Sequence, residues 1–184
     1  MKFINIIGTT GSGKSTLAKQ LAEKRQLNYI ELDDLLWLDD WQESSNDALF
    51  YKLKIARENA ATGWVLDGLY TRTVPIILGR VDTVIWLDYP FHINLYRLTK
   101  RTLGRVISQK KLWKNSNNKE SLKMMLSKES IFVWLMKSYP KNRKKYFNLM
   151  HNPAYQHIQF IHLTSPKQTR NFLDNLREKS VSNS

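Results

Sequence analysis

The stretch that most constrains this chain lies near its N-terminus, where residues 8–16 read Gly-Thr-Thr-Gly-Ser-Gly-Lys-Ser-Thr. This stretch satisfies G-x-x-x-x-G-K-[ST], the pattern of a phosphate-binding loop, or P-loop. An apolar, β-branched run at residues 3–7 precedes it, and residues 17–22 carry helical spacing. Strand, loop and helix therefore occur in the order that a P-loop requires. The sequence predicts a binding site for a nucleoside triphosphate.

Each part of this loop has an expected task in holding a polyphosphate. Its glycines let the backbone turn N–H groups inward, and the helix that begins near Gly13 adds unsatisfied N–H groups and its positive dipole end. We expect Lys14 to span the β- and γ-phosphates and the Ser15 hydroxyl to bind Mg²⁺. The predicted nucleotide-binding residues are Gly8, Thr9, Thr10, Gly11, Ser12, Gly13, Lys14, Ser15 and Thr16.

Downstream of the loop, strand-like runs alternate with helical patterns. We predict strands at residues 28–32, 64–67, 81–87 and 159–163, and helices at residues 45–61, 91–108, 121–138 and 168–179. Pro140 is expected to interrupt the helix of residues 121–138, and residues 109–118 are expected to form a polar, mobile loop. The alternation predicts an α/β fold, with a five-stranded parallel sheet covered by helices on both faces. Residues 1–179 would form one domain and residues 180–184 a disordered tail.

A carboxylate closes the predicted strand at residues 64–67. Asp67 ends this apolar run, which is the pattern of the second P-loop element, whose Asp holds Mg²⁺ directly or through water. Ser15 and Asp67 are therefore the predicted metal residues, and ATP and Mg²⁺ the predicted cofactors.

Composition excludes several other classes of protein. The chain of 184 residues has no cysteine, which rules out disulfides and thiolate metal sites and fits a cytoplasmic protein. No apolar run approaches the roughly 20 residues that span a bilayer, and the apolar start is too short for a signal peptide. The four histidines lack metal-ligand spacing and have no evident nucleophile partner. We therefore expect neither a membrane protein nor a histidine-dependent hydrolase.

Positive charge is concentrated in the second half of the chain. Residues 1–90 hold 10 Lys/Arg and 12 Asp/Glu, whereas residues 91–184 hold 19 and 4, within a net charge of +13. This asymmetry favours a polyanionic partner, either nucleic acid or the phosphates of a nucleotide beneath a basic lid. A solvated, lysine-rich surface remains the alternative.

Two groups of residues carry a resemblance to known families. Residues 67–72, Asp-Gly-Leu-Tyr-Thr-Arg, resemble the Asp-Gly-Phe-Pro-Arg segment of adenylate kinases, with one extra residue before the arginine. A wider set is similar to the DNA topology modulation proteins, a small family within the nucleoside monophosphate kinase-like P-loop proteins. That set comprises Glu31-Leu32-Asp33, Trp37, Trp41, Asp67-Gly68-x-Tyr70-x-Arg72 and Arg97-x-x-x-Arg101.

The resemblance runs from residue 1 to about residue 147 and implies a P-loop kinase fold with a small helical lid. The acceptor-binding segment would be about residues 33–62 and the lid about residues 105–120. The implied catalytic residues are Lys14, Asp33, Arg72, Arg97 and Arg101, and the implied acceptor-binding residues are Asp33, Trp37, Trp41, Tyr70 and Arg72.

Each of these assignments has an alternative. Arg97 and Arg101 would clamp the transferring phosphoryl, or they would belong to a solvated helix face. Asp33 would orient or deprotonate an acceptor hydroxyl; Asp34 is its rival, and a helix N-cap is the structural alternative for either residue. Trp37 and Trp41 would stack on a planar substrate or simply pack in the core.

The residues taken together predict a cytoplasmic kinase that transfers the γ-phosphoryl of ATP, with Mg²⁺, to a nucleotide, a nucleoside or another small hydroxyl acceptor. The alternative function is a nucleotide-controlled protein that binds DNA or RNA through its basic C-terminal half. Neither the acceptor nor the oligomeric state follows from the sequence.

Overall fold

The computed structural model describes residues 1–109, 111–121, 123, 127 and 130–181, and five of its segments form one sheet. The strand order is β2-β3-β1-β4-β5, and every neighbouring pair is parallel. The strands are β1 Phe3–Gly8, β2 Asn28–Glu31, β3 Trp64–Asp67, β4 Thr83–Leu87 and β5 Gln159–Leu163. The predicted five-stranded parallel sheet is confirmed, with small shifts in where β2 ends and β4 begins.

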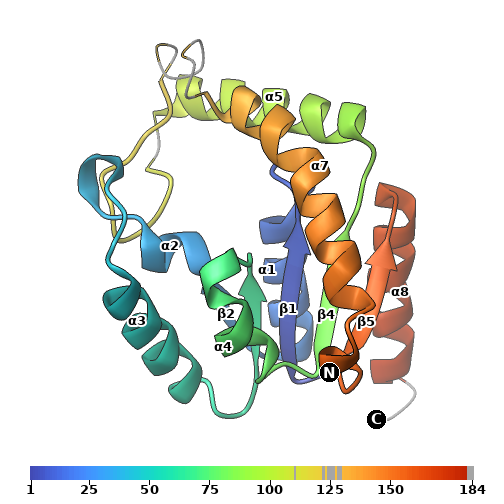
Figure 1. The fold of residues 1–184 in the computed structure, drawn as a ribbon. Helices are drawn as coiled ribbons and strands as arrows, with labels where there is room; N and C mark the ends of the chain where they lie inside the picture. Colours follow the sequence, from blue (N-terminus) through green and yellow to red (C-terminus); the bar gives the residue numbers. More distant parts are fainter. Residues whose placement is uncertain (110, 122, 124–126, 128–129, 182–184) are drawn as a thin grey trace.

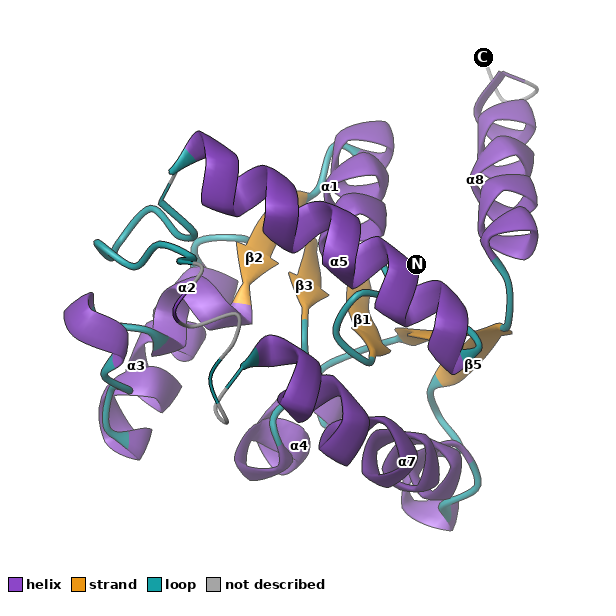
Figure 2. Cartoon of the chain, turned by 90° about the horizontal axis from the view of Figure 1, so that it is seen from above, coloured by secondary structure: helices purple, strands orange, loops and turns teal. Residues whose placement is uncertain are grey.

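Helices cover both faces of this sheet. The helices are α1 Lys14–Arg25, α2 Leu32–Leu36, α3 Asn46–Glu58, α4 Val74–Leu78, α5 Phe91–Ser108, α7 Ile131–Met150 and α8 Pro166–Val181. One apolar cluster joins Ile30 and Leu66 of the sheet to Leu49 of α3, Ile77 of α4 and Tyr146 of α7. Figure 2 shows these helices on one side of the strands, with α1 and α8 on the other. The core therefore has two layers, one on each side of the sheet.

The second layer is smaller and lies beneath the P-loop. Ile4, Ile6 and Ile85 point to the face where Leu17 and Leu21 of α1 pack together with Leu173 of α8. Alternate residues of a strand face opposite sides, so β1 contributes Ile7 to one cluster and Ile6 to the other. Burial on both faces explains why the strands read as continuous apolar runs in the sequence.

Three short 3₁₀ helices lie in the connections between the longer elements. Their bounds are Asp39–Trp41, Thr71–Thr73 and Pro153–Tyr155. Residues 32–36, which the sequence indicated only as the end of a strand and an acidic connection, form α2. Helix α3 is capped by Ser45, whose Oγ accepts a hydrogen bond from the Ala48 N–H at 3.2 Å.

The expected break at Pro140 is wrong. Helix α7 runs from Ile131 through Pro140 to Met150, whereas the predicted helix of residues 121–138 falls partly outside the described residues. Proline removes the hydrogen bond to the carbonyl of Met136. Pro140 and Met136 are both exposed, so water can satisfy that carbonyl and the helix continues.

The carboxyl ends of the strands meet at one edge of the sheet, and α5 crosses above this edge (Figure 1). In an open parallel sheet this edge is where ligands bind. The expected lid range, about residues 105–120, begins in the last turn of α5 and continues as a loop without helix over residues 111–120. Helix α8 extends to Val181 and so includes the first two residues of the expected tail; residues 182–184 lie outside the described residues. No helix in the described part of the chain is long and apolar enough to cross a bilayer.

Candidate nucleotide and acceptor site

The P-loop joins the end of β1 to the start of α1, and its backbone leaves no room for side chains at two glycines. Gly11 has φ +81°, and a Cβ there would lie 2.4 Å from the carbonyl oxygen of Asn94. Gly13 has φ +92°, and a Cβ there would lie 3.0 Å from a guanidinium nitrogen of Arg97. A side chain at Gly11 would strain the loop and push the α5 backbone away, whereas one at Gly13 would strain the loop and displace the Arg97 guanidinium. The glycines thus allow α5 to pack directly on the loop.

Lys14, the first residue of α1, folds back over its own loop. Its Nζ donates a hydrogen bond to the Thr9 carbonyl at 3.3 Å. Burial lowers the pKa of Lys14, and the nearby carboxylates of Asp67 and Asp33 partly offset that effect. The ammonium group therefore lies among the P-loop carbonyl, the end of β3 and the start of α2.

Ser15 and Asp67 come from neighbouring parts of the sheet edge. Asp67 pairs in register with Ile6 of β1, two residues before the P-loop begins. Its Oδ2 accepts a hydrogen bond from the Tyr29 hydroxyl at 3.3 Å, whereas its buried Oδ1 has no hydrogen-bond partner in the structure. Ser15 is exposed at the start of α1. An unpaired carboxylate oxygen and an exposed hydroxyl are both oxygen ligands of the kind that a hard cation such as Mg²⁺ takes.

The protein ligands at this place are few. Among the residues that the structure describes, no group of three or more His, Cys, Asp or Glu is arranged to hold a metal ion. Mg²⁺ is commonly held by one or two protein oxygens together with phosphate oxygens and water. A metal here would therefore depend on bound nucleotide.

Asp33 and Asp34 follow each other in α2 but point to different partners. Tyr70 donates a short hydrogen bond to Asp33 Oδ1. Asp34 instead accepts two hydrogen bonds from Asn115, from its backbone N–H at 3.1 Å and its amide at 3.0 Å. The N-cap of α2 is Glu31, so the capping alternative is wrong for both aspartates.

The surroundings of Asp33 shift its pKa in opposite directions. Burial raises the pKa of Asp33, while the hydrogen bond from Tyr70 and the positive charges of Lys14 and Arg101 lower it. The first effect is the largest, so the net pKa lies above that of an ordinary aspartate. A carboxylate with a raised pKa is a better proton acceptor.

The two arginines of α5 separate in space although they are one turn apart. Arg97 donates a hydrogen bond to the Ser12 carbonyl at 3.3 Å, and its guanidinium lies 5.5 Å from the ring centre of Tyr89. Arg101 is half-buried, and its Nε has no hydrogen-bond partner in the structure. The alternative of a solvated face is therefore wrong for both arginines.

Arg101 faces the acidic side of the edge. Burial and the neighbouring Arg105 lower the pKa of Arg101, and the carboxylates of Glu120, Asp33 and Asp67 partly offset this. Arg105 pairs with Glu120 at 3.1 Å. Glu120 thus neutralises Arg105 and leaves the guanidinium of Arg101 directed toward the carboxylates.

Arg72 is held by the acceptor segment. It contacts Glu43 at 2.8 Å and Asn46 at 3.1 Å, and it lies over the ring of Tyr70. Its charge is thus matched by a carboxylate, unlike that of Arg101. The structure brings Lys14, Asp33 and Arg101 together and keeps Arg72 in an ion pair beside them.

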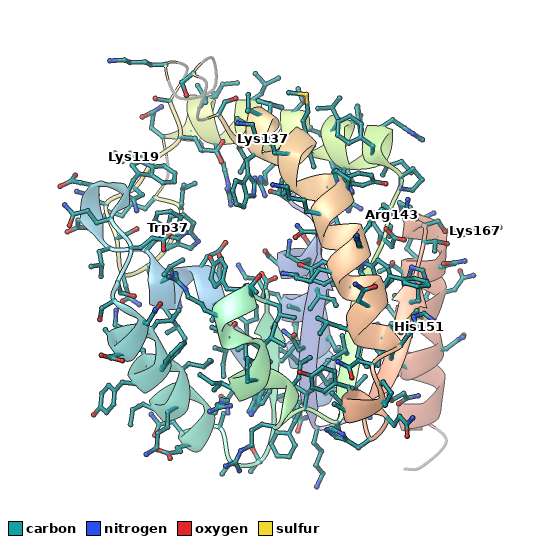
Figure 3. The ribbon with its side chains drawn as sticks, viewed as in Figure 1. Trp37, Lys119, Lys137, Arg143, His151 and Lys167 are labelled. Atoms are coloured by element: carbon teal, nitrogen blue, oxygen red, sulfur yellow. The ribbon has the colours of Figure 1, made fainter. Side chains whose placement is uncertain are left out.

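Trp37 and Trp41 pack against a third tryptophan that sequence reasoning missed. Trp37 and Trp113 stack with ring centres 5.7 Å apart and an interplanar angle of 12°. Trp41 meets both rings edge-on, at 5.9 and 5.8 Å. Figure 3 shows Trp37 among side chains below the loop that follows α5. The only signal for this cluster was a tryptophan within an otherwise polar and basic loop.

That loop, residues 111–118, is bound to the turn at residues 39–41. Asn117 N–H donates to Asp39 Oδ1 at 2.7 Å, and the side-chain oxygen of Asn118 accepts from the Trp41 N–H at 2.8 Å. Asp40 and Trp41 have φ values of +54° and +60°, a backbone conformation that L-residues adopt at a cost of about 1–2 kcal/mol each. The asparagines therefore stabilise a strained turn, which the prediction of a mobile loop did not anticipate.

A pocket of about 240 Å³ borders the P-loop on the side where α8 begins. Its lining comes from the P-loop and α1, from Tyr89 and Arg97, and from the start of α8 at Pro166 and Thr169. Arg97 therefore belongs to this pocket, whereas Arg101 belongs to the edge near Asp33.

Comparisons with known proteins relate this chain to other P-loop proteins. An uncharacterized protein of Bacillus subtilis (strain 168), YqaC, is 28% identical over 104 residues, which are 56% of this chain and 58% of that protein. An adenylate kinase of Methanothrix thermoacetophila is 27% identical over 128 residues, 54% of this chain and 59% of that protein. The chain spans a little under three fifths of the length of each curated relative.

A solved sugar kinase from Janibacter sp. HTCC2649 has a similar fold, with a TM-score of 0.50 and 15% identity over 99% of this chain and 93% of that protein. The P-loop kinase-like fold is thus shown, while the narrower resemblance to the DNA topology modulation proteins stays a prediction. Residues 4–123 match the model of an AAA domain family, AAA_18. The chain belongs to this family of P-loop NTPases.

Proposed function

We propose that this protein is an ATP-dependent kinase that transfers the γ-phosphoryl group to a hydroxyl of a small molecule. The observation that carries the proposal is the gathering of Lys14, Asp33 and Arg101 at the carboxyl edge of the sheet. Two cations near one P-loop suit a transferring phosphoryl group, and a half-buried carboxylate on which both charges act suits an acceptor hydroxyl.

The pocket between α1, α5 and α8 is the proposed place for the base and ribose of the nucleotide. It opens beside Ser12 and Gly13, so a polyphosphate can pass from it into the P-loop. Arg97 lines this pocket and contacts the loop itself. We therefore assign Arg97 to nucleotide binding, in place of the phosphoryl clamp expected from the sequence.

Mg²⁺ is the proposed metal. Ser15 and Asp67 would hold it beside the nucleotide phosphates, because their oxygens are exposed or unpaired there. When bound, the ion neutralises charge on the phosphate oxygens. Lys14 supplies a second cation at the same place.

Asp33 has the role of orienting and deprotonating the acceptor. The acceptor oxygen forms a bond to the γ-phosphorus, its proton moves to Asp33, and the bond between that phosphorus and the bridging oxygen of ADP breaks. Tyr70 fixes the carboxylate through its hydrogen bond, and Arg101 offsets charge on the transferring group.

An acceptor screen with labelled ATP and Mg²⁺ tests this function. Small hydroxyl compounds are incubated with the protein, and the label is followed into product. We expect labelled product from the wild-type protein and much slower labelling with Asp33→Asn, which should still bind a non-hydrolysable ATP analogue. Unchanged product formation in Asp33→Asn would contradict the assigned role.

The nucleic-acid alternative has weaker support from the site. Arg97, Arg101 and Arg105 are half-buried and engaged within the protein, so this face of α5 does not offer an open row of cations to a phosphate backbone. Salt-dependent DNA binding that survives Arg101→Ala would keep that alternative as a separate property of other basic residues.

A further inference from the structure

One lysine of α7 differs from the other basic residues of that helix. Lys141 and Lys144 are exposed, and Arg143 is paired with Asp88 at 2.8 Å. Lys145 is half-buried, and its Nζ donates to the Leu69 carbonyl at 3.4 Å. No carboxylate among the described residues forms an ion pair with it.

The position of Lys145 places its ammonium beside the acceptor side of the site. Leu69 lies two residues after Asp67 and directly before Tyr70, the residue that holds Asp33. The next residue on α7, Tyr146, is 4% exposed and lies in the core beside Leu69. The helix is therefore packed on the sheet, and Lys145 is fixed next to the Tyr70 loop.

The charge of Lys145 is poorly compensated there. Burial lowers its pKa, with no opposing contribution from a carboxylate. An ammonium has three donors, and only one contact to a carbonyl accompanies its 4.8 Å approach to the Tyr146 ring. A partly desolvated cation is stabilised by an anion placed against it.

Arg72, the residue that the sequence predicts to bind the acceptor here, already forms an ion pair within the protein. Arg72 is paired with Glu43 at 2.8 Å, so an acceptor that used Arg72 would have to displace a carboxylate. Lys145 requires no such exchange. Lys145 contacts the Leu69 carbonyl and Arg72 contacts the Tyr70 ring, so both cations lie at the segment that carries Tyr70.

We propose that Lys145 binds an anionic group of the acceptor, so that the substrate is a small hydroxyl compound that carries a carboxylate or a phosphate. This proposal rests on the proposed kinase function and names the class of its acceptor. The hydroxyl lies at Asp33, which Tyr70 holds, and the anionic group lies at Lys145, which contacts the residue before Tyr70.

The test measures binding of simple anions, because this requires no turnover. Protein with ¹³Cε-labelled lysine is saturated with Mg²⁺ and a non-hydrolysable ATP analogue, which fills the P-loop. Inorganic phosphate is titrated in one arm and acetate in the other, and the Lys145 resonance is assigned by its loss in Lys145→Met. This variant keeps the aliphatic packing of the side chain.

We expect at least one anion to shift the Lys145 resonance in a saturable manner, and Lys145→Met to weaken that binding by about tenfold or more. The arm with the tighter binding identifies the anionic group. Lys144→Met, the exposed neighbour, should bind as the wild type does, and Lys145→Arg should recover most of the affinity. Thermal unfolding of each variant checks that the fold is kept.

A Lys145 resonance that neither anion moves, or equal binding in Lys145→Met and Lys144→Met, would overturn the proposal. Such a result together with phosphoryl transfer in the acceptor screen would leave the kinase function standing. Anion binding at Lys145 without phosphoryl transfer in the acceptor screen would contradict the proposed kinase function and leave the anion site standing.

Discussion

The two sides of the sheet edge are built in different ways. The nucleotide side consists of a contiguous loop and an adjoining pocket. The backbone and the glycines determine the shape of that loop. The acceptor side is assembled from side chains far apart in sequence, such as Asp33 with Tyr70 and Trp41 with Asn118. The first side should depend on a few fixed positions, and the second on how several segments pack together.

The largest expected effect is on the nucleotide side. Lys14→Ala removes the cation that donates to the Thr9 carbonyl of the P-loop, and we expect it to abolish turnover. Circular dichroism should remain unchanged, because the side-chain hydrogen bond that Lys14 makes within the described residues is to Thr9 in its own loop. A variant with wild-type turnover would show that the loop does not serve phosphoryl transfer.

On the acceptor side, the adjacent aspartates form a matched pair. Asp33→Asn should lower turnover by about 10²- to 10⁴-fold, the range for loss of a general base. Asp34→Asn should have a small effect, because Asp34 contacts only the loop at Asn115. Steady-state kinetics with one acceptor measures both variants. Equal losses of turnover in the two variants would contradict the assignment of the general base to Asp33.

The raised pKa of Asp33 also predicts how turnover depends on pH. The base must be ionised, so turnover should fall as the pH decreases through a pKa that lies above the ordinary aspartate value of about 3.9. The pH profile of kcat/KM should show this acidic limb in the wild type. If the residual activity of Asp33→Asn keeps the same limb, another group is responsible for it.

The proposed metal pair links the two sides. Asp67→Asn should weaken Mg²⁺-dependent turnover by about tenfold or more, while nucleotide binding without metal changes little, because the neutral amide is a poorer Mg²⁺ ligand. Titrations of nucleotide with and without Mg²⁺ separate these effects. Equal losses in both titrations would make Asp67 a structural residue.

The smallest effect is expected in the loop of residues 111–118. Asn118→Ala removes hydrogen bonds to the Trp41 N–H and the Leu38 carbonyl, and should reduce the free energy of unfolding by about 1–3 kcal/mol. Acceptor KM should rise while nucleotide affinity stays constant. Urea unfolding followed by tryptophan fluorescence measures the stability, with the exposed Lys119→Ala as control. A nucleotide affinity that also falls would show that the two sides are not separate.

The difference between the sides also explains what the sequence could predict. The P-loop and the five strands were predictable because each is a local pattern in contiguous residues. The pairing of Tyr70 with Asp33, the engagement of Arg72 by Glu43 and the burial of Lys145 depend on contacts across many residues. Helical spacing put Arg97 and Arg101 on one face, but it does not record that Arg97 contacts the P-loop backbone whereas Arg101 lies near Asp33 and Asp67.

Nor does composition reveal a tryptophan cluster. Trp37, Trp41 and Trp113 come from segments that are more than 70 residues apart, and the last of them lies in a stretch without periodicity. Pro140 was misjudged for a related reason: whether a proline ends a helix depends on the solvent exposure of the carbonyl that it leaves unbonded. That exposure is a property of the folded chain.

The separation of Arg97 from Arg101 is the central claim, and one paired measurement tests it most directly. Affinity for a non-hydrolysable ATP analogue and kcat are measured on Arg97→Ala and on Arg101→Ala. We expect Arg97→Ala to weaken the affinity for the analogue by about tenfold with a smaller change in kcat, and Arg101→Ala to lower kcat by about a hundredfold with affinity nearly unchanged. The same pattern of losses in both variants would contradict the division of this site into a nucleotide side and an acceptor side.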